Sequence, residues 1–202
     1  MMSSDFTRRG FVAAISATTL AAALPTSAFA LTDAQAKSLI DKAVVDINKV
    51  INSGKSLNGM IRDFERIFVK YGDVPIIARS ALGADARRAS KSQLNAYTKA
   101  FQGYMSRKYG KRFNEFVGGQ ITVLSSGKVK SFHEVKTSVK LRGQAPFGVN
   151  FLVSDRSGKS KFFDMIIEGI SLRLSEKAEI GAMLDRRKGD INGLIADLKK
   201  AG

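Results

Sequence analysis

Hydrophobic residues recur at steps of three and four between residue 32 and residue 117. This spacing predicts amphipathic helices over residues 32–52, 57–70, 76–82 and 90–117. The last of these helices has the most aromatic face, and Ser90 followed by Gln93 predicts a capping box at its start. Its apolar positions are Leu94, Tyr97, Phe101, Tyr104, Met105, Tyr109, Phe113, Phe116 and Val117.

The hydrophobic period changes to two after Gly118 and Gly119. Alternating segments around residues 121–123, 129–141, 147–153 and 161–167 predict four sequential antiparallel strands, with a hairpin turn at Ser126 and Gly127. Helical spacing returns over residues 175–188 and again from Asp190. The predicted fold is therefore α+β, a helical layer packed on a curved four-stranded antiparallel sheet, with helices at both ends of the chain.

The first thirty residues have the pattern of an export signal. Residues 7–12 read Thr-Arg-Arg-Gly-Phe-Val, an apolar run follows to Leu24, and Ala28-Phe29-Ala30 is an A-x-A cleavage site. This pattern predicts a twin-arginine signal peptide over residues 1–30, cleaved after Ala30. Its apolar run is shorter than the ~20 residues that a membrane-spanning helix needs. We expect a soluble, exported protein with a single domain over residues 31–202, divided into helices (31–118), sheet (119–170) and C-terminal helices (171–202).

Composition narrows the possible partners. The chain has no cysteine, which excludes disulfides, thiolate metal sites and a lipid anchor at the cleavage point. The formal net charge is +15, and the predicted signal peptide accounts for little of it. Such a charge favours anionic partners, and for an exported protein these are lipid headgroups rather than nucleic acid. A basic surface that serves only solubility is the alternative.

The residues that catalysis would need are sparse. The only histidine, His133, lies in the middle of a predicted strand and has no cysteine to activate. Asp164 and Glu168 share a strand face about 13 Å apart, too far for a carboxylate dyad. Ser171 lacks the glycine pattern of a nucleophile elbow and is interpreted as a turn or capping residue. We therefore expect no enzyme activity, no metal and no cofactor.

Two segments carry a resemblance to a known family. Residues 78–83 (Ala-Arg-Ser-Ala-Leu-Gly) lead into the aromatic helix, and residues 163–172 read Phe-Asp-Met-Ile-Ile-Glu-Gly-Ile-Ser-Leu. With the order helices, meander, helices, they resemble the MlaC family over essentially the whole chain after residue 30. The sequence departs from the family pattern at Lys161-Phe162, at Ala86 and at residues 175–177, where tryptophans and an Asn-Tyr-Arg run are usual.

The resemblance implies a periplasmic phospholipid carrier, an auxiliary (toluene-tolerance) component of the Mla ABC lipid-transport system that maintains outer-membrane lipid asymmetry. Its implied partners are phospholipid, an inner-membrane ABC transporter complex and an outer-membrane lipoprotein complex, and the carrier is expected to be monomeric. Arg79, Arg87 and Arg88 are candidate contacts for lipid headgroups or a membrane surface. The candidate contacts for acyl tails are Ile76, Ile77, Tyr97, Phe101, Met105, Val135, Val139, Phe151, Met165, Ile167 and Met183.

Other interpretations stay open at the level of sequence. A hopanoid-associated branch of the same family is the nearest alternative. A hydrolase or isomerase on a similar cone-shaped sheet would need a polar constellation, such as a buried His133 paired with Asp164. A periplasmic structural or adhesion protein would have a filled core. For a carrier, Gly103, Gly110 and Gly118-Gly119 are candidate hinges between helices and sheet.

Overall fold

The computed structural model describes residues 31–202, and the predicted signal peptide lies outside these residues. Helix α1 (Asp33–Ile51) begins with a capping box in which Thr32 accepts from the amide of Gln35 and the Gln35 side chain accepts from the amide of Thr32. The other helices are α2 (Leu57–Tyr71), α3 (Val74–Leu82), the 3₁₀ helix η1 (Gly83–Arg87), α4 (Lys91–Gly110), α5 (Phe113–Phe116), α6 (Leu172–Arg186) and α7 (Ile191–Leu198).

The helix predicted over residues 90–117 is interrupted at Gly110, where the glycine in the apolar pattern predicts close packing or a bend. The capping box of Ser90 and Gln93 is confirmed, but α4 ends at Gly110 and a turn separates it from α5. At Gly110 the helix passes so close to α2 that an added Cβ would lie 2.9 Å from Cγ1 of Ile61. The position therefore requires glycine, which is a poor helix former.

The sheet is an antiparallel meander in the order β1-β2-β3-β4-β5. The four predicted strands are present, and a two-residue fifth strand is added at the edge. The α+β class, with helices at both ends of the chain, is confirmed. The strands are β1 (Gln120–Val129), β2 (Phe132–Lys140), β3 (Phe147–Ser154), β4 (Lys161–Ile167) and β5 (Ile170–Ser171).

The predicted hairpin turn at Ser126 and Gly127 is wrong. Both residues lie within β1, where they pair with Val135 and Glu134, and the turn comes at Lys130 and Ser131. A register shift between Val123 and Ser125 marks a bulge in β1. The bulge inserts an extra residue and interrupts the two-residue alternation. The sequence of the second half of β1 therefore lacks the regular alternation of apolar and polar residues that predicts a strand.

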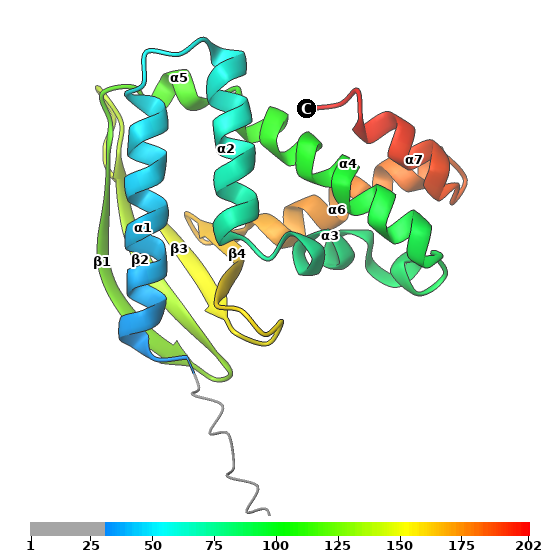
Figure 1. Cartoon of the computed structure of the whole chain (residues 1–202), viewed down its shortest axis with the longest axis horizontal. Coiled ribbons are helices and arrows are strands. Elements are labelled where there is room, and N and C mark those ends of the chain that lie inside the picture. The colour runs from blue at the N-terminus through cyan, green and yellow to red at the C-terminus, as the bar shows by residue number, and fades with distance from the viewer. Residues whose placement is uncertain (1–30) are drawn as a thin grey trace, which may run out of the picture.

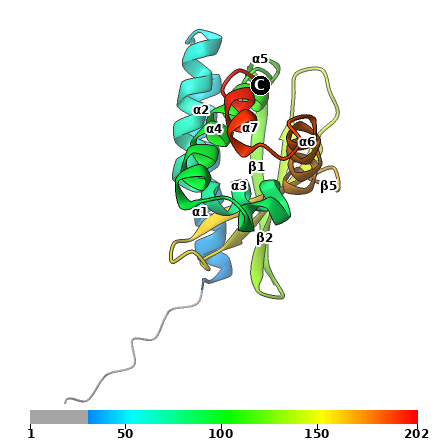
Figure 2. The same ribbon diagram turned by 90° about the vertical axis from the view of Figure 1, so that its right-hand side faces the viewer.

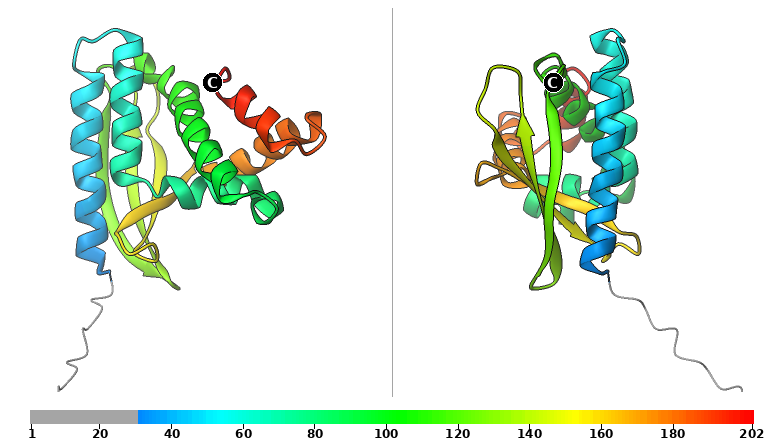
Figure 3. Two further views of the ribbon diagram at one scale, coloured as in Figure 1. Left: turned by 45° about the vertical axis from the view of Figure 1, so that its right-hand side comes forward. Right: turned by 90° about the vertical axis from the view of Figure 1, so that its left-hand side faces the viewer.

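The helices form two groups around the sheet (Figures 1 and 3). Helix α1 packs along β1 and β2, and α2 lies beside α1. In the second group, α4 packs against α3 and α7, while α6 packs against α3 and β4. Seen from the right of Figure 1, α6 and α7 lie apart from the α1–α2 pair, with α4 between them (Figure 2). Helix α2 contacts both α1 and α4, so it lies where the two groups meet.

The junction between the sheet and α6 is organised by the buried side chain of Asp164. Its carboxylate accepts hydrogen bonds from the Ser171 hydroxyl (2.7 Å), the Met165 amide (2.8 Å) and the Arg173 amide (2.9 Å). Ser171 in turn caps α6 by accepting from the amide of Leu174. Helix α6 consequently starts at Leu172, three residues before the predicted start, and Ser171 is the predicted capping residue.

Replacing the Ser171 cap gives a test of this junction. We expect Ser171→Ala to lower the free energy of unfolding by about 1–2 kcal/mol, because it removes both the N-cap of α6 and the hydroxyl that donates to the buried Asp164 carboxylate. Ser175→Ala is the matched control, because the Ser175 hydroxyl only donates to the Ser171 carbonyl from an exposed position. Urea unfolding measures both variants. Equal losses would contradict the assignment of Ser171 as the cap.

Candidate functional site

An apolar cavity of about 40 Å³ lies where the two groups of helices meet the sheet. Four elements wall it: α1, α2, α4 and β4. Every lining side chain is apolar except for the hydroxyl of one tyrosine. The lining residues are Ala43, Ile47, Phe64, Ile67, Phe68, Met105, Tyr109, Phe162 and Met165. A space walled in this way favours hydrocarbon over water.

Two of the candidate tail contacts, Met105 and Met165, line this cavity. Most of the others are buried elsewhere in the core. Tyr97 and Phe101, for example, are fully buried and pack ring against ring, with centroids 5.8 Å apart. The remaining buried members of the predicted set are Ile77, Val135, Val139, Phe151 and Met183, and Ile167 is half-buried.

Ile76 and the predicted headgroup arginines lie at the surface. Ile76 is 39 % exposed and lines a separate cleft of about 170 Å³ with Phe132, Phe163, Arg156 and Lys161, among others. Arg79, Arg87 and Arg88 are exposed, and Arg88 pairs with Asp85. None of the three arginines lines the apolar cavity. Their role as headgroup or membrane contacts stays a prediction.

Sequence reasoning missed most of the cavity wall. Ile47, Phe64, Ile67 and Phe68 fall on the predicted inner faces of the first two helices, and Phe162 lies in a predicted strand. Periodicity identifies such positions as buried. It does not distinguish the part of the core that is filled from the part that is hollow, since both are lined by the same residue types.

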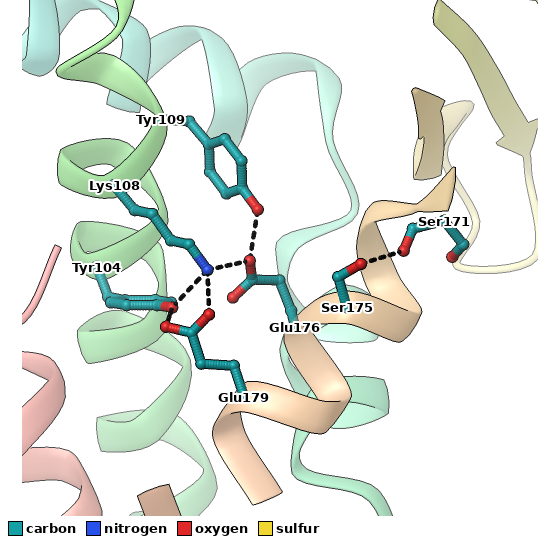
Figure 4. Close-up of polar contacts among 7 residues, drawn as sticks. All are labelled: Tyr104, Lys108, Tyr109, Ser171, Ser175, Glu176 and Glu179. Atoms are coloured by element: carbon teal, nitrogen blue, oxygen red, sulfur yellow. Dashed lines mark hydrogen bonds and ion pairs between the residues drawn. The ribbon is translucent and has the colours of Figure 1, made fainter. Parts of the chain in front are cut away.

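A polar cluster joins α4 to α6 (Figure 4). Its centre is Glu176, which is fully buried. The Oε1 atom of Glu176 accepts from the Tyr109 hydroxyl at 2.5 Å and from Nζ of Lys108 at 2.8 Å. Lys108 also pairs with Glu179, which accepts from the Tyr104 hydroxyl. Tyr109 also lines the cavity. The cluster therefore holds one of the cavity-lining side chains in place through the tyrosine hydroxyl.

Burial and neighbouring charges fix the protonation states of Tyr104, Tyr109, Lys108 and Glu179 at neutral pH. Burial, reinforced by hydrogen bonds to glutamates, raises the pKa of Tyr104 and Tyr109 well above the ordinary range. Burial alone would lower the pKa of Lys108, but its bonds to Glu176 and Glu179 raise it overall. Burial would raise the pKa of Glu179, yet the bonds from Lys108 and Tyr104 lower it overall. The phenols therefore donate and Lys108 stays charged.

The second oxygen of Glu176, Oε2, is buried and has no hydrogen-bond partner among residues 31–202, and the same is true of the Tyr97 hydroxyl. Buried polar atoms of this kind are costly in free energy.

His133 does not form the catalytic pair considered from the sequence. Its Nδ1 lies 2.6 Å from Oδ1 of Asp33, in the first turn of α1, whereas Asp164 is engaged by Ser171 and Arg173. Within the described part of the chain, no group of three or more histidines and carboxylates is placed to hold a metal ion. No described helix is long and apolar enough to cross a membrane.

Comparison with known proteins gives two findings. A family model described as MlaC protein matches residues 37–200. Among solved structures, a phospholipid-binding protein from Ralstonia solanacearum, in complex with a phospholipid, superposes with a TM-score of 0.70. The two sequences are 19% identical, and the match covers 82% of this chain and 95% of the other. At this identity the structural likeness establishes a common fold.

Proposed function

The chain belongs to the MlaC family, and we propose that it is a periplasmic carrier that encloses the acyl tails of a phospholipid in the cavity between its helices and its sheet. The observation that carries the proposal is the apolar cavity itself, walled by α1, α2, α4 and β4. The phospholipid in the similar solved structure supports the class of ligand. In this proposal the protein binds its cargo and does not transform it chemically.

The energetics favour burial of the tails. An acyl chain gains about 0.8 kcal/mol for each methylene that leaves water, so about fifteen methylenes gain about 12 kcal/mol. A carrier must therefore cover the tails, whereas the headgroup can stay in water. An apolar lining without a ring of convergent polar groups suits this requirement.

The cavity must open to accept such a ligand. A volume of about 40 Å³ has room for only about three water-sized groups. A whole acyl chain enters only if the walls part, and we propose that the α1–α2 side of the molecule moves against α4. The glycine at position 110, where α4 ends against α2, is the predicted hinge nearest to this contact.

The proposal includes the route of the protein and its partners. Export by the twin-arginine signal over residues 1–30, with cleavage after Ala30, would deliver residues 31–202 to the periplasm as a soluble domain. There the carrier would move phospholipid between an outer-membrane lipoprotein complex and an inner-membrane ABC transporter complex. The sequence pattern and family membership support this part of the proposal.

A vesicle assay tests whether the cavity carries the lipid. Donor vesicles hold a self-quenched fluorescent phospholipid, and transfer to unlabelled acceptor vesicles is followed with and without the protein. We expect Ile47→Lys to slow transfer about fivefold, because it places a charge at the cavity wall. The effect is moderate because Ile47 is only half-buried and a lysine there can extend toward water.

The matched control is Val45→Lys, which makes the same change of charge on the same helix at a position that is 51 % exposed. We expect this variant to transfer lipid at the unmodified rate. Equal rates for the two variants would contradict the cavity as the carrying site. No transfer by the unmodified protein would contradict the carrier function.

A further inference from the structure

The backbone nitrogen of Leu31 donates to Oδ2 of Asp155 at 3.0 Å. Leu31 immediately follows the predicted cleavage site, and its side chain is buried, 8 % exposed. Asp155 lies in the turn between β3 and β4, where its carbonyl accepts from the Gly158 amide. Within residues 31–202, the Leu31 nitrogen is the only hydrogen-bond partner of the Asp155 carboxylate. The first residue after the predicted signal peptide is thus held against the sheet.

Cleavage after Ala30 would change the chemistry of this one atom. Hydrolysis of the peptide bond between Ala30 and Leu31 turns the neutral amide of Leu31 into an α-amino group. Such groups have an ordinary pKa of about 8 and are mostly protonated at neutral pH. A neutral hydrogen bond to Asp155 would then become an ion pair, and charge-assisted hydrogen bonds are roughly twice as strong as neutral ones.

We propose that Asp155 is the acceptor for the new N-terminal ammonium, so that removal of the signal peptide itself completes a clamp between α1 and the sheet. This inference rests on the export and cleavage included in the proposed function. The clamp has a second contact two residues further along the chain, where Oδ1 of Asp33 in α1 lies 2.6 Å from Nδ1 of His133 in β2. Together the two contacts fasten the start of α1 to the sheet.

The clamp has a consequence for the opening of the cavity. Fastening the start of α1 to β2 and to the β3–β4 turn keeps α1 on the sheet when the walls part. The movement then falls on the contact between α2 and α4, at the other side of the cavity wall. Processing would in this way determine where the carrier opens.

A thermodynamic cycle on the complete processed chain tests the ion pair. One protein begins at Leu31, and a second carries the neutral extension Gly-Ser-Gly before Leu31, which moves the ammonium away from Asp155. Each is made with and without Asp155→Asn. We expect the extension to lower the melting temperature by about 2–4 °C in the unmodified background and to have no effect in the D155N background.

A control is Asp41→Asn, which neutralises another carboxylate of α1, in the middle of the helix, where it pairs with Lys37. In this background we expect the extension to keep its full effect. The proposal is overturned if the extension has no effect on the unmodified protein, or if its effect persists in D155N.

A second measurement needs no substitution at Asp155 and stands even if D155N fails to fold. The α-amino group is labelled with an aldehyde selective for N-termini, and labelling is followed by intact mass. We expect the protein that begins at Leu31 to react several-fold more slowly than the extended protein, and equal rates would overturn the ion pair.

The mass of the exported protein gives the start of the processed chain, and a start other than Leu31 would also overturn the proposal. Lipid transfer is measured separately in the vesicle assay, so failure of the clamp and failure of the carrier function are distinguishable.

Discussion

A disulfide between positions 61 and 110 is expected to slow phospholipid transfer at least about tenfold, because it joins two walls that must part. A Cβ at Gly110 would lie 3.5 Å from the Cβ of Ile61, at the near end of the range of about 3.5–4.5 Å found in disulfides. The double variant Ile61→Cys, Gly110→Cys therefore links α2 to α4. Because the chain has no cysteine of its own, no other disulfide can form within one molecule.

The link is placed where the two sides of the molecule meet. Helix α2 is tied to α1 through Asp46, which accepts from the Tyr71 hydroxyl at 2.6 Å and pairs with Lys70. Helix α4 is tied to α6 by the Lys108–Glu176 ion pair. It is tied to the end of α7 by Arg107, which donates to the carbonyls of Leu198 and Ala201. Helices α2 and α4 are themselves joined by a hydrogen bond from Nε2 of Gln102 to Oε1 of Glu65, at 2.6 Å. We propose that the separation falls at this contact and breaks that bond.

The oxidised and reduced forms of the double variant are compared in the vesicle assay described above. We expect dithiothreitol to restore transfer to the rate of the control Ile61→Ser, Gly110→Ser, which also removes Cγ1 of Ile61 but cannot form the link. An oxidised protein that transfers lipid as fast as its reduced form would show that α2 and α4 do not separate during loading.

The second large effect is expected at Glu176. Breaking a buried ion pair costs about 3–5 kcal/mol when the remaining charge has no other partner. Lys108 keeps Glu179 as a partner and its side chain is 28 % exposed, so we expect Glu176→Gln to lower the free energy of unfolding by about 2–3 kcal/mol. Urea unfolding at neutral pH measures the loss.

Glu179→Gln is the matched control, because Glu179 lies on the same helix and binds the same lysine from a side chain that is 47 % exposed. We expect this variant to lose less than about 1 kcal/mol, as exposed ion pairs usually do. A loss of similar size in both variants would contradict the view that the buried carboxylate organises the α4–α6 contact.

Local signals in the sequence predicted most of the secondary structure. Thr32 and Ser90 start their helices as expected, because a capping side chain acts within one turn and leaves a local pattern. Ser171 was also correctly interpreted as a capping residue. The start of α6 was placed too late because the supporting Asp164 acts across the β4–β5 turn, a contact that helical periodicity does not contain.

The features that the sequence did not predict have a common physical cause. Each depends on contacts between elements, which a local sequence pattern does not contain. The bulge in β1 lies where its pairing with β2 shifts register, and the turn of this hairpin is displaced accordingly. At Gly110 the sequence predicts close packing or a bend, but the partner, Ile61 of α2, is distant in sequence and cannot be identified from the local pattern. The pairing of His133 with Asp33 joins residues a hundred positions apart and left no pattern that could have predicted it.

The candidate site was predicted only in part for a similar reason. Residue type and periodicity identified Met105 and Met165 as inward-facing, and both line the cavity. The same criteria selected Tyr97 and Phe101, which fill the core instead. The position of a cavity depends on how several faces fit together, so it appears only when the elements are assembled.

Native mass spectrometry of the protein purified from the periplasm without detergent, followed by solvent extraction of any bound lipid, tests whether the protein carries phospholipid. We expect a mass excess that matches one phospholipid, and a phospholipid in the extract. A bound hopanoid or other polycyclic lipid would contradict the assignment of phospholipid as the cargo. A protein that is purified without lipid and takes none from vesicles would contradict lipid carriage altogether.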